Sequence, residues 1–350
     1  MSLQTYGIKE LREREESAGS SREKVRERRR VFPHTVEENI VGLEDNVNEL
    51  VNVLVDEEKN FRVMSIFGMG GLGKTTLAKK VYNHEKVMSN YNNLAWVYIS
   101  QQCRRRDVWE GILSGLTSGA DAERILKLRD EQLAEELHKF LQDNKCMVVL
   151  DDIWSIEAWD SLKAAFPNKT ESKILLTTRN KDLALYADPK GFLHEPKCLK
   201  DVESWELFHK IAFARVDDTP DFKIDERMEE LGKQMVGHCA GLPLAITVLG
   251  GLLATKHTLK QWRMVAENIQ TYITKGIGYG EDRSAVSDVL SLSYDDLLPH
   301  LKQCFLCLGH FPEDYEIPVD KLIKFWIADG IVPSDQYRGG GQGKNIGGCG

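Results

Sequence analysis

Short apolar runs alternate with amphipathic segments over the first 200 residues of the chain. Four short runs predict strands, and they span residues 61–67, 94–100, 146–152 and 173–178. The run at 146–152 is continuously apolar before its two carboxylates, which is typical of a parallel strand covered on both faces. Apolar positions at helical spacing predict helices near residues 45–56, 75–88, 108–116 and 131–141. The alternation predicts an α/β fold, with a parallel sheet and helices on both faces.

The pattern changes after about residue 200, where only helical periodicity remains. Helical faces recur between residues 204 and 239, and a mostly apolar helix is expected over residues 245–254. Three further short helices, near residues 285–294, 300–308 and 318–330, are typical of a winged-helix or helix-turn-helix unit. DNA binding by this unit is disfavoured, because residues 313–316 are acidic or aromatic and present no basic face.

A glycine-rich motif follows the first predicted strand. Residues 68–76, Gly-Met-Gly-Gly-Leu-Gly-Lys-Thr-Thr, fit the G-x-x-x-x-G-K-[ST] pattern of phosphate-binding loops (P-loops). Glycines allow the backbone N–H groups to turn toward an anion, and the helix that follows directs its positive end to the same place. Lys74 can reach the β- and γ-phosphates, and the Thr75 hydroxyl can bind Mg²⁺. Strand, loop and helix in this order predict a nucleotide-phosphate site in a P-loop NTPase sheet.

Two carboxylates lie at the end of the third predicted strand, and an arginine follows the fourth. Asp151 and Asp152 close the run over residues 146–152, at the edge of the sheet where ligands of parallel sheets bind. One carboxylate there can hold Mg²⁺ and the next can orient or deprotonate an attacking water. Arg179 follows the fourth strand. From the residues alone, contact with a γ-phosphate and a place on a surface loop are equally good interpretations of this arginine.

Two later motifs have competing interpretations. Pro243 lies in Gly-Leu-Pro-Leu at residues 241–244, just before a helix, where a proline needs no N–H. A corner between helices is favoured over a prolyl ring lying against adenine. Cys304 and Cys307, with His310, allow a zinc site. Their spacing along an apolar helix favours buried core cysteines instead.

Composition and charge narrow the class of protein. The chain has 350 residues, 42% hydrophobic and 29% charged, which is typical of a globular protein of two or three domains. The net charge of −8 argues against direct nucleic-acid binding. No secretory signal or apolar run of about 20 residues is found, so no transmembrane segment is expected. Seven scattered cysteines favour a reducing, intracellular compartment.

The two ends of the chain differ from its middle. Residues 1–32 are rich in Arg and Glu, and a charged linker is favoured over a nuclear-import or nucleic-acid patch at residues 22–30, because glutamates are interleaved. Residues 339–350 are glycine-rich and are expected to be a disordered tail.

Taken in order, the motifs resemble the NB-ARC domain of plant NLR disease-resistance proteins, a family of signal-transducing P-loop ATPases. The similarity covers roughly residues 33–335 and rests on residues 68–76, 147–154, 173–179, 241–244 and 304–314. It is greatest to the coiled-coil class, in which a tryptophan follows the acidic motif as Trp154 does here. The resemblance implies the trailing end of a coiled-coil region (1–32), a P-loop nucleotide-binding domain (33–200), a helical ARC subdomain (201–275), an incomplete winged-helix ARC subdomain (276–338) and the tail (339–350).

The resemblance also implies roles for particular residues. Asp152 would serve hydrolysis, Asp151 and Thr75 would hold Mg²⁺, and Arg179 would sense the γ-phosphate from a strand inserted between the phosphate-loop strand and the Asp strand. Val41 and Gly42 would border the adenine, on which Pro243 would pack. The phosphates would be held by Gly68, Gly70, Gly71, Gly73, Lys74, Thr75 and Thr76.

The implied function is an ADP/ATP switch module of an intracellular plant immune receptor. ADP would hold an off state, and ATP would permit association with other receptor domains or receptor copies, with slow hydrolysis as the reset. The receptor would be cytoplasmic, with membrane-peripheral or nuclear placement also open. The sequence departs from the family's pattern in three ways that bear on the ADP-bound off state. No full coiled coil precedes residue 33, no leucine-rich repeat follows, and the chain stops before the family's Met-His-Asp motif, whose His contacts ADP. The alternatives are a continuously turning-over P-loop ATPase of remodelling type and an interaction decoy with an idle nucleotide site.

Overall fold

The structure is a computed structural model that describes residues 40–59, 61–101, 104–117, 121–214, 226–276, 285–311 and 317–331. Several expectations fall outside these residues. They are the charged linker at 1–32, the domain start at 33, the acidic residues 313–316 and the glycine-rich tail at 339–350.

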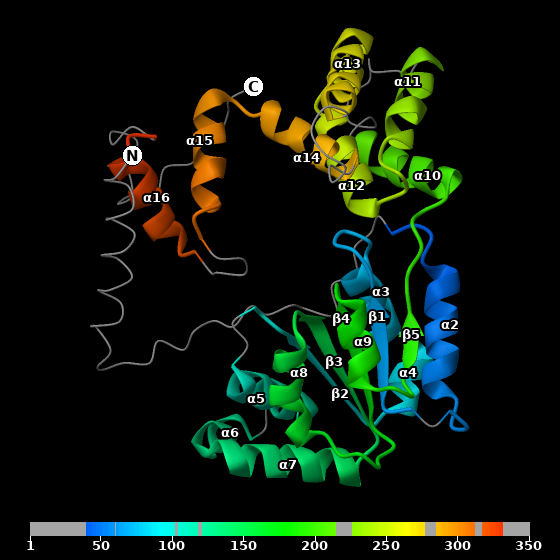
Figure 1. The fold of residues 1–350 in the computed structure, drawn as a ribbon, viewed down its shortest axis with the longest axis vertical. Coiled ribbons are helices and arrows are strands. Elements are labelled where there is room, and N and C mark those ends of the chain that lie inside the picture. Colours follow the sequence, from blue (N-terminus) through cyan, green and yellow to red (C-terminus); the bar gives the residue numbers. More distant parts are fainter. Residues whose placement is uncertain are drawn as a thin grey trace. The chain divides into compact units, whose positions relative to one another are not determined.

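A parallel sheet of five strands forms the centre of the part before residue 200, and four of its strands are those that the apolar runs predict. Its spatial order is β2-β3-β4-β1-β5 (Figure 1). The strands are β1 (Val63–Phe67), β2 (Asn93–Tyr98), β3 (Cys146–Ile153), β4 (Lys173–Thr178) and β5 (Phe192–His194). Strand β4 lies between β1 and β3, in the inserted position that the resemblance implied. The short strand β5 was not predicted.

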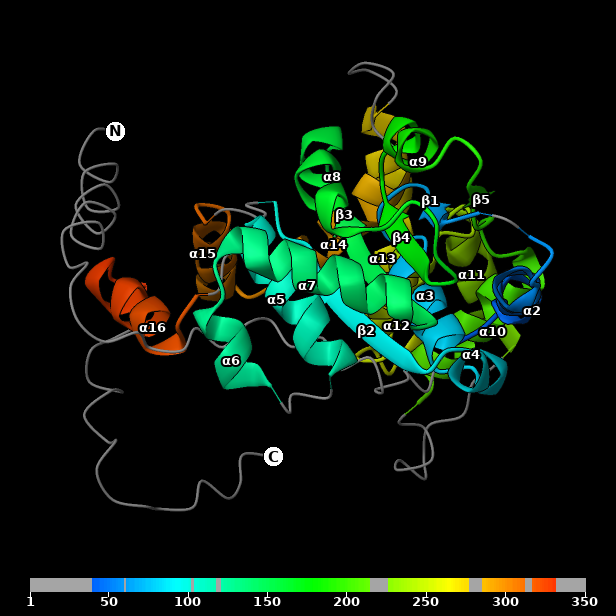
Figure 2. The same ribbon diagram turned by 90° about the horizontal axis from the view of Figure 1, so that it is seen from below.

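Helices cover both faces of this sheet, because its strands are apolar on both. Along β3, Val148 and Leu150 face one core and Met147 and Val149 face the other. The second of these cores is shared with α2 (Glu44–Val55), α3 (Lys74–Tyr82) and α4 (Glu85–Asn90). The first is shared with α5 (Arg105–Leu116), α6 (Ala122–Lys127), α7 (Asp130–Asp143), α8 (Ile156–Leu162), the 3₁₀ turn η1 (Lys163–Ala165) and α9 (Lys181–Ala187). Figure 2 shows α5 and α7 lying across the sheet.

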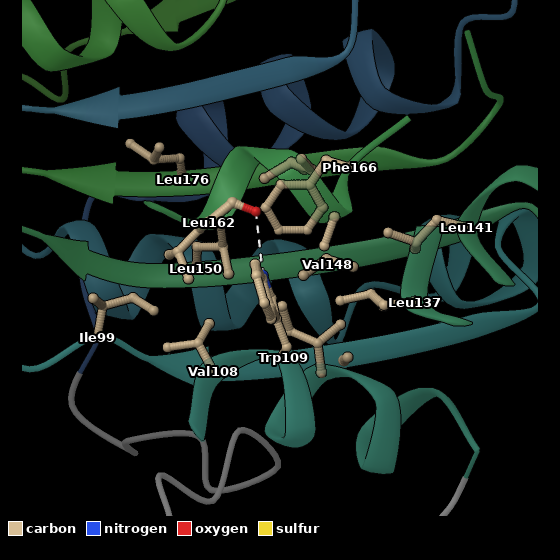
Figure 3. Packing of buried hydrophobic residues seen from close by; sticks show 14 of the residues in the cluster. Ile99, Val108, Trp109, Leu137, Leu141, Val148, Leu150, Leu162, Phe166 and Leu176 are labelled. Atoms are coloured by element: carbon tan, nitrogen blue, oxygen red, sulfur yellow. Dashed lines mark hydrogen bonds between the residues drawn. The ribbon is translucent and has the colours of Figure 1, made fainter. Parts of the chain in front are cut away.

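The core between α5, α7 and β3 is built around Trp109 (Figure 3). This indole is 3% exposed and donates its N–H to the carbonyl of Leu162 at the end of α8, at 3.2 Å. Burial of a side chain this large is a main source of core stability, and the bond satisfies its one polar atom. Val148 and Leu150 of β3 pack into the same core. The strand that carries the two carboxylates near its end is therefore packed firmly against α5 and α7.

One predicted helix is broken in the structure. The expected helix at residues 75–88 is two helices, α3 and α4, separated at Asn83 and His84. The Asn83 side chain and backbone N–H both donate to the carbonyl of Lys79, which caps α3. His84 is extended and its ring accepts from the N–H of Lys86, which starts α4. Local capping therefore outcompetes the helical periodicity.

Seven helices are described beyond residue 200, and the first five of them, α10 to α14, share one core with Val41 and Leu72. They are α10 (Asp201–Ala212), α11 (Glu226–Gly237), α12 (Pro243–Leu253), α13 (Leu259–Gly276), α14 (Ala285–Asp295), α15 (Pro299–Leu308) and α16 (Val319–Ala328). Phe208 and Trp262 are fully buried in this core, together with Ile246 and Leu249 of α12. Val289 and Leu292 of α14 join it. The division into subdomains at residues 275 and 276 stays a prediction.

The described residues bear on the cysteine motif and on the expectation about membrane spans. Cys307 is buried, as a core cysteine would be, whereas Cys304 is partly exposed. Among the described residues, no group of three or more His, Cys, Asp and Glu side chains is placed to hold a metal ion. None of the described helices is long and apolar enough to cross a membrane.

Candidate phosphate-binding site

The glycine-rich loop joins the end of β1 to the start of α3. Gly68, Gly71 and Gly73 adopt φ angles of 143°, 79° and 88°, which residues with a Cβ rarely do. A Cβ at Gly71 would also lie 2.6 Å from the Cβ of Leu244. Gly70 is exposed, with an ordinary φ. The loop has the left-handed glycines that an anion-binding turn of backbone N–H groups requires.

Lys74, the first residue of α3, folds back over this loop. Its Nζ donates to the carbonyl oxygens of Gly68 at 2.8 Å and Met69 at 2.9 Å. Burial lowers the pKa of Lys74; Asp152 and Asp151 oppose the shift and Arg179 adds to it. An ammonium has three donors, and these bonds use two of them. The side chain is thus held at the mouth of the loop with one donor left for an anion.

Asp151 is a buried carboxylate that two hydroxyl groups stabilise. Its Oδ1 accepts from Thr75 Oγ1 at 2.9 Å and from Thr177 Oγ1 at 2.6 Å. The residue is 1% exposed, and burial raises its pKa while the two hydrogen bonds oppose the rise. Carboxylate and hydroxyl oxygens are the donors that Mg²⁺ prefers. The donor set at Thr75 and Asp151 therefore fits this ion, whose charge would offset the buried carboxylate.

Asp152 sits on a bulge in β3. The register with β4 shifts between Leu150 and Ile153, and Asp152 has a φ of 62°. Its N–H donates to Thr177 Oγ1 at 2.8 Å, so one hydroxyl serves both carboxylate residues. The bulge gives consecutive residues different surroundings: Asp151 is buried, whereas Asp152 is only partly so.

The carboxylate of Asp152 faces two side chains from neighbouring strands. Tyr98 Oη, at the end of β2, donates to its Oδ2 at 3.3 Å. Arg179 Nη2, just after β4, lies 3.6 Å from the same oxygen. The Arg179 guanidinium stacks on the ring of Trp154, with 4.3 Å between Cζ and the ring centroid. A Cβ at Gly70 would lie 4.0 Å from that Cζ. Although 46% exposed, Arg179 is thus at the phosphate loop.

The residues expected around the base lie beside the same loop. Leu244 N–H, in the first turn of α12 after Pro243, donates to the carbonyl of Gly71 at 3.2 Å. Val41 is 8% exposed and shares a core with Leu72 of the loop. Gly42 has a φ of 72°, and a Cβ there would lie 2.8 Å from Leu199. Thr76 is partly buried in the first turn of α3.

The structure brings five of the predicted residues together at the carboxyl ends of β1, β3 and β4: Lys74, Thr75, Asp151, Asp152 and Arg179. Val41, Gly42 and Pro243 lie outside the strands, before α2 and at the start of α12. The structure adds three side chains that sequence reasoning did not assign to the site: Tyr98, Trp154 and Thr177. Each lies within two residues of the end of a predicted strand, and that shared position is the signal that would have found them.

A family model and the most similar relatives in the comparison with known proteins agree on one family. The model of the NB-ARC domain family matches residues 43–218. A putative disease resistance protein of Arabidopsis thaliana is 53% identical over 332 residues, covering 95% of this chain and 38% of the relative. The probable disease resistance RPP8-like protein 2 of the same plant is 45% identical over 331 residues, covering 94% and 36%. The chain therefore spans less than two fifths of these relatives.

A solved structure is similar in fold. It is the signal transduction ATPase with numerous domains from Pyrococcus horikoshii, a protein with a tetratricopeptide repeat sensor. The TM-score is 0.52 at 15% identity, covering 84% of this chain and 38% of that one. At this identity the likeness supports the fold alone.

Proposed function

Because this chain belongs to the NB-ARC family, we propose that it is the adenine-nucleotide-binding switch module of an intracellular plant immune receptor. The observation that carries the proposal is the β1–α3 loop, with Lys74 folded over it beside the buried pair of Thr75 and Asp151. The disease resistance proteins that it resembles support the receptor context.

In this proposal the loop and the start of α3 hold the phosphates. Backbone N–H groups between Gly68 and Gly73, with the positive end of the helix, attract the anion. The third donor of Lys74 binds a β- or γ-phosphate oxygen while its other two keep the ammonium over the loop. Val41, Gly42 and Pro243 border the base, since α12 is tied to the loop through Leu244.

Thr75 and Asp151 are the residues that would hold Mg²⁺. The ion would neutralise charge on the bound phosphates. Thr75 donates its hydrogen to Asp151, which leaves the lone pairs of the same hydroxyl oxygen for a cation. Thr177 fixes the Asp151 carboxylate from the other side. Both ligands are therefore positioned before any ion arrives.

The arrangement around Asp152 suits a slow switch better than continuous turnover. As a base or orienting group, Asp152 must accept a hydrogen bond from water, and Tyr98 and Arg179 would compete with that water for its Oδ2. Arg179 is shared between this carboxylate and the edge of the loop, where a γ-phosphate would lie. ADP then defines the off state and ATP the on state, in which other receptor domains or receptor copies are engaged in the cytoplasm.

The first test is nucleotide binding by Lys74→Ala. We expect the unaltered protein to retain ADP through purification and Lys74→Ala to retain none, measured by identifying the nucleotide released on denaturation and by titration with labelled ADP. Lys80→Ala, a change of the same kind in the same helix, is the matched control and should bind normally. An unchanged ADP affinity in Lys74→Ala would contradict the proposal.

A second test separates hydrolysis from binding. Asp152→Ala should slow phosphate release by about 100-fold or more, as expected for loss of a general base, and leave ADP affinity near normal. Loss of binding as complete as in Lys74→Ala would make Asp152 a structural residue instead.

A further inference from the structure

A groove of about 220 Å³ lies between α11 and α13, which pack side by side in the helical part of the chain (Figure 1). Its lining combines exposed polar side chains with two half-buried leucines that pack on the core. Arg227, Glu230, Leu231 and Gln234 come from α11, and Leu259 and Arg263 come from α13. None of them belongs to the candidate phosphate site, so the groove is independent of the proposed function.

The two arginines of the groove are without partners. Among the described residues, none forms an ion pair or a hydrogen bond with the guanidinium of Arg227 or Arg263. By contrast, Lys233 on the same helix α11 is paired with Glu229 at 2.6 Å. A guanidinium carries five N–H donors in one plane and binds a carboxylate through two of them at once. The groove therefore presents two cationic groups that are ready to bind an acidic ligand.

The single carboxylate of the groove leaves its charge positive. Glu230 lies one helical turn from Arg227 but forms no ion pair with either arginine among the described residues. The lining thus carries two positive charges and one negative charge, on a chain whose net charge is −8. A positive groove on an acidic protein favours an acidic partner.

The packing of the two helices fixes the distance between their arginines. Gly232 of α11 faces Trp262 of α13, and a Cβ at this glycine would lie 3.2 Å from that ring. Trp262 is fully buried, and its N–H donates to the carbonyl of Lys256 at 3.0 Å. The groove is therefore preformed, which lowers the entropic cost of occupying it.

The size of the groove suits a short peptide segment. Its α11 side runs from Arg227 to Gln234, about 10 Å at 1.5 Å per residue. An extended peptide covers this length with about three residues. The volume is below the roughly 300–1,000 Å³ typical of small-molecule pockets, so it takes a few side chains and no larger ligand.

We propose that the α11–α13 groove is a docking site for a short, extended acidic segment of another protein. Carboxylates of the segment bind Arg227 and Arg263 from the two helices. An apolar side chain between these carboxylates covers Leu231 and Leu259, and Gln234 offers an amide to the backbone of the segment.

The test is fluorescence anisotropy with a labelled, end-blocked peptide, Gly-Glu-Leu-Glu-Gly, and the full chain at low salt. We expect saturable binding, and binding about tenfold weaker or less for the neutral peptide Gly-Gln-Leu-Gln-Gly. Arg227→Gln and Arg263→Gln should each weaken binding of the acidic peptide about fivefold, the size of a well-formed exposed ion pair. Glu230→Gln should strengthen it about twofold, because a like charge is removed.

The matched control is Lys233→Gln, which removes a positive charge from α11 outside the groove and should leave the affinity unchanged. All four positions are exposed, so the variants should fold as the unaltered chain does, which circular dichroism checks. Failure of the acidic peptide to bind, equal binding of the neutral peptide, or equal weakening by Lys233→Gln would overturn the inference. Sedimentation velocity examines a second copy as the occupant: a dimer that Arg263→Gln dissociates would also overturn it.

Discussion

The hydroxyl of Thr177 gives the most exacting prediction, because one atom serves two residues of the site. It donates to Asp151 Oδ1 at 2.6 Å and accepts from the N–H of Asp152 at 2.8 Å, and the residue is 1% exposed. Thr177→Val replaces the hydroxyl with a methyl group of similar volume. Packing is kept, and both hydrogen bonds are removed at once.

The expected cost follows from these two bonds. A hydrogen bond to a charged group contributes about 1.5–3 kcal/mol, and a buried N–H left without a partner costs about 1–3 kcal/mol. We therefore expect Thr177→Val to lower the free energy of unfolding by about 3–5 kcal/mol, a large part of the roughly 5–15 kcal/mol typical of a domain. Thr177→Ser keeps the hydroxyl and loses one methyl group, so it should cost only about 1 kcal/mol.

Urea denaturation of the nucleotide-free protein, followed by circular dichroism, measures both changes. The informative quantity is the difference between the valine and serine variants, since both remove or alter atoms at one buried position. Equal stabilities for the two would refute the reasoning, because the hydroxyl would then hold neither Asp151 nor the bulge at Asp152.

Two further predictions concern the same region. Asp151→Asn keeps an oxygen that accepts from both hydroxyls but removes the buried charge. Because burial raises the pKa of Asp151 above its ordinary 3.8, this residue stabilises the fold at low pH, and that contribution is lost as pH rises through the raised pKa. Melting temperatures of the nucleotide-free protein across a pH series should therefore be higher at neutral pH, and less pH-dependent, in Asp151→Asn; an unchanged profile would contradict this. Gly71→Ala should lower the melting temperature more than Gly73→Ala. Both require a left-handed alanine, costing about 1–2 kcal/mol, but only at Gly71 would the new Cβ meet another residue, Leu244, at 2.6 Å. Equal shifts would argue against a close contact there.

The sheet was predictable where long apolar runs carry the signal, and not elsewhere. Strands β1, β3 and β4 match their runs because they are buried on both faces. Strand β2 matches its run too, although only Ala95 of its residues is fully buried. Strand β5 has only three residues, too few for a period to emerge. Its pairing with β1 comes from tertiary structure instead. The break between α3 and α4 was missed because Asn83 and His84 act through local hydrogen bonds, which a hydrophobic pattern does not record.

The residues of the site also fall into those that the sequence predicts and those that it does not. The phosphate loop was predictable because its chemistry lies in nine consecutive residues, and Asp151 and Asp152 because they end an apolar run. The link through Thr177 was not, since it depends on a register shift between two strands that are 20 residues apart in the chain. Trp154 was noted as a mark of resemblance only. Its contact with Arg179 follows from the side-by-side placement of β3 and β4, which no local pattern specifies.

The strand order also determines when the site can exist during folding. Both neighbours of β1 in the sheet, β4 and β5, come after it in the chain by more than a hundred residues, as in the pairing of Val63 with Ile174. Closing so long a loop is entropically costly and slow. A growing chain would thus display the whole motif at residues 68–76 long before any sheet could support it. Nucleotide capture is expected to come late, after β4 has entered between its neighbours, and to report that the sheet is complete.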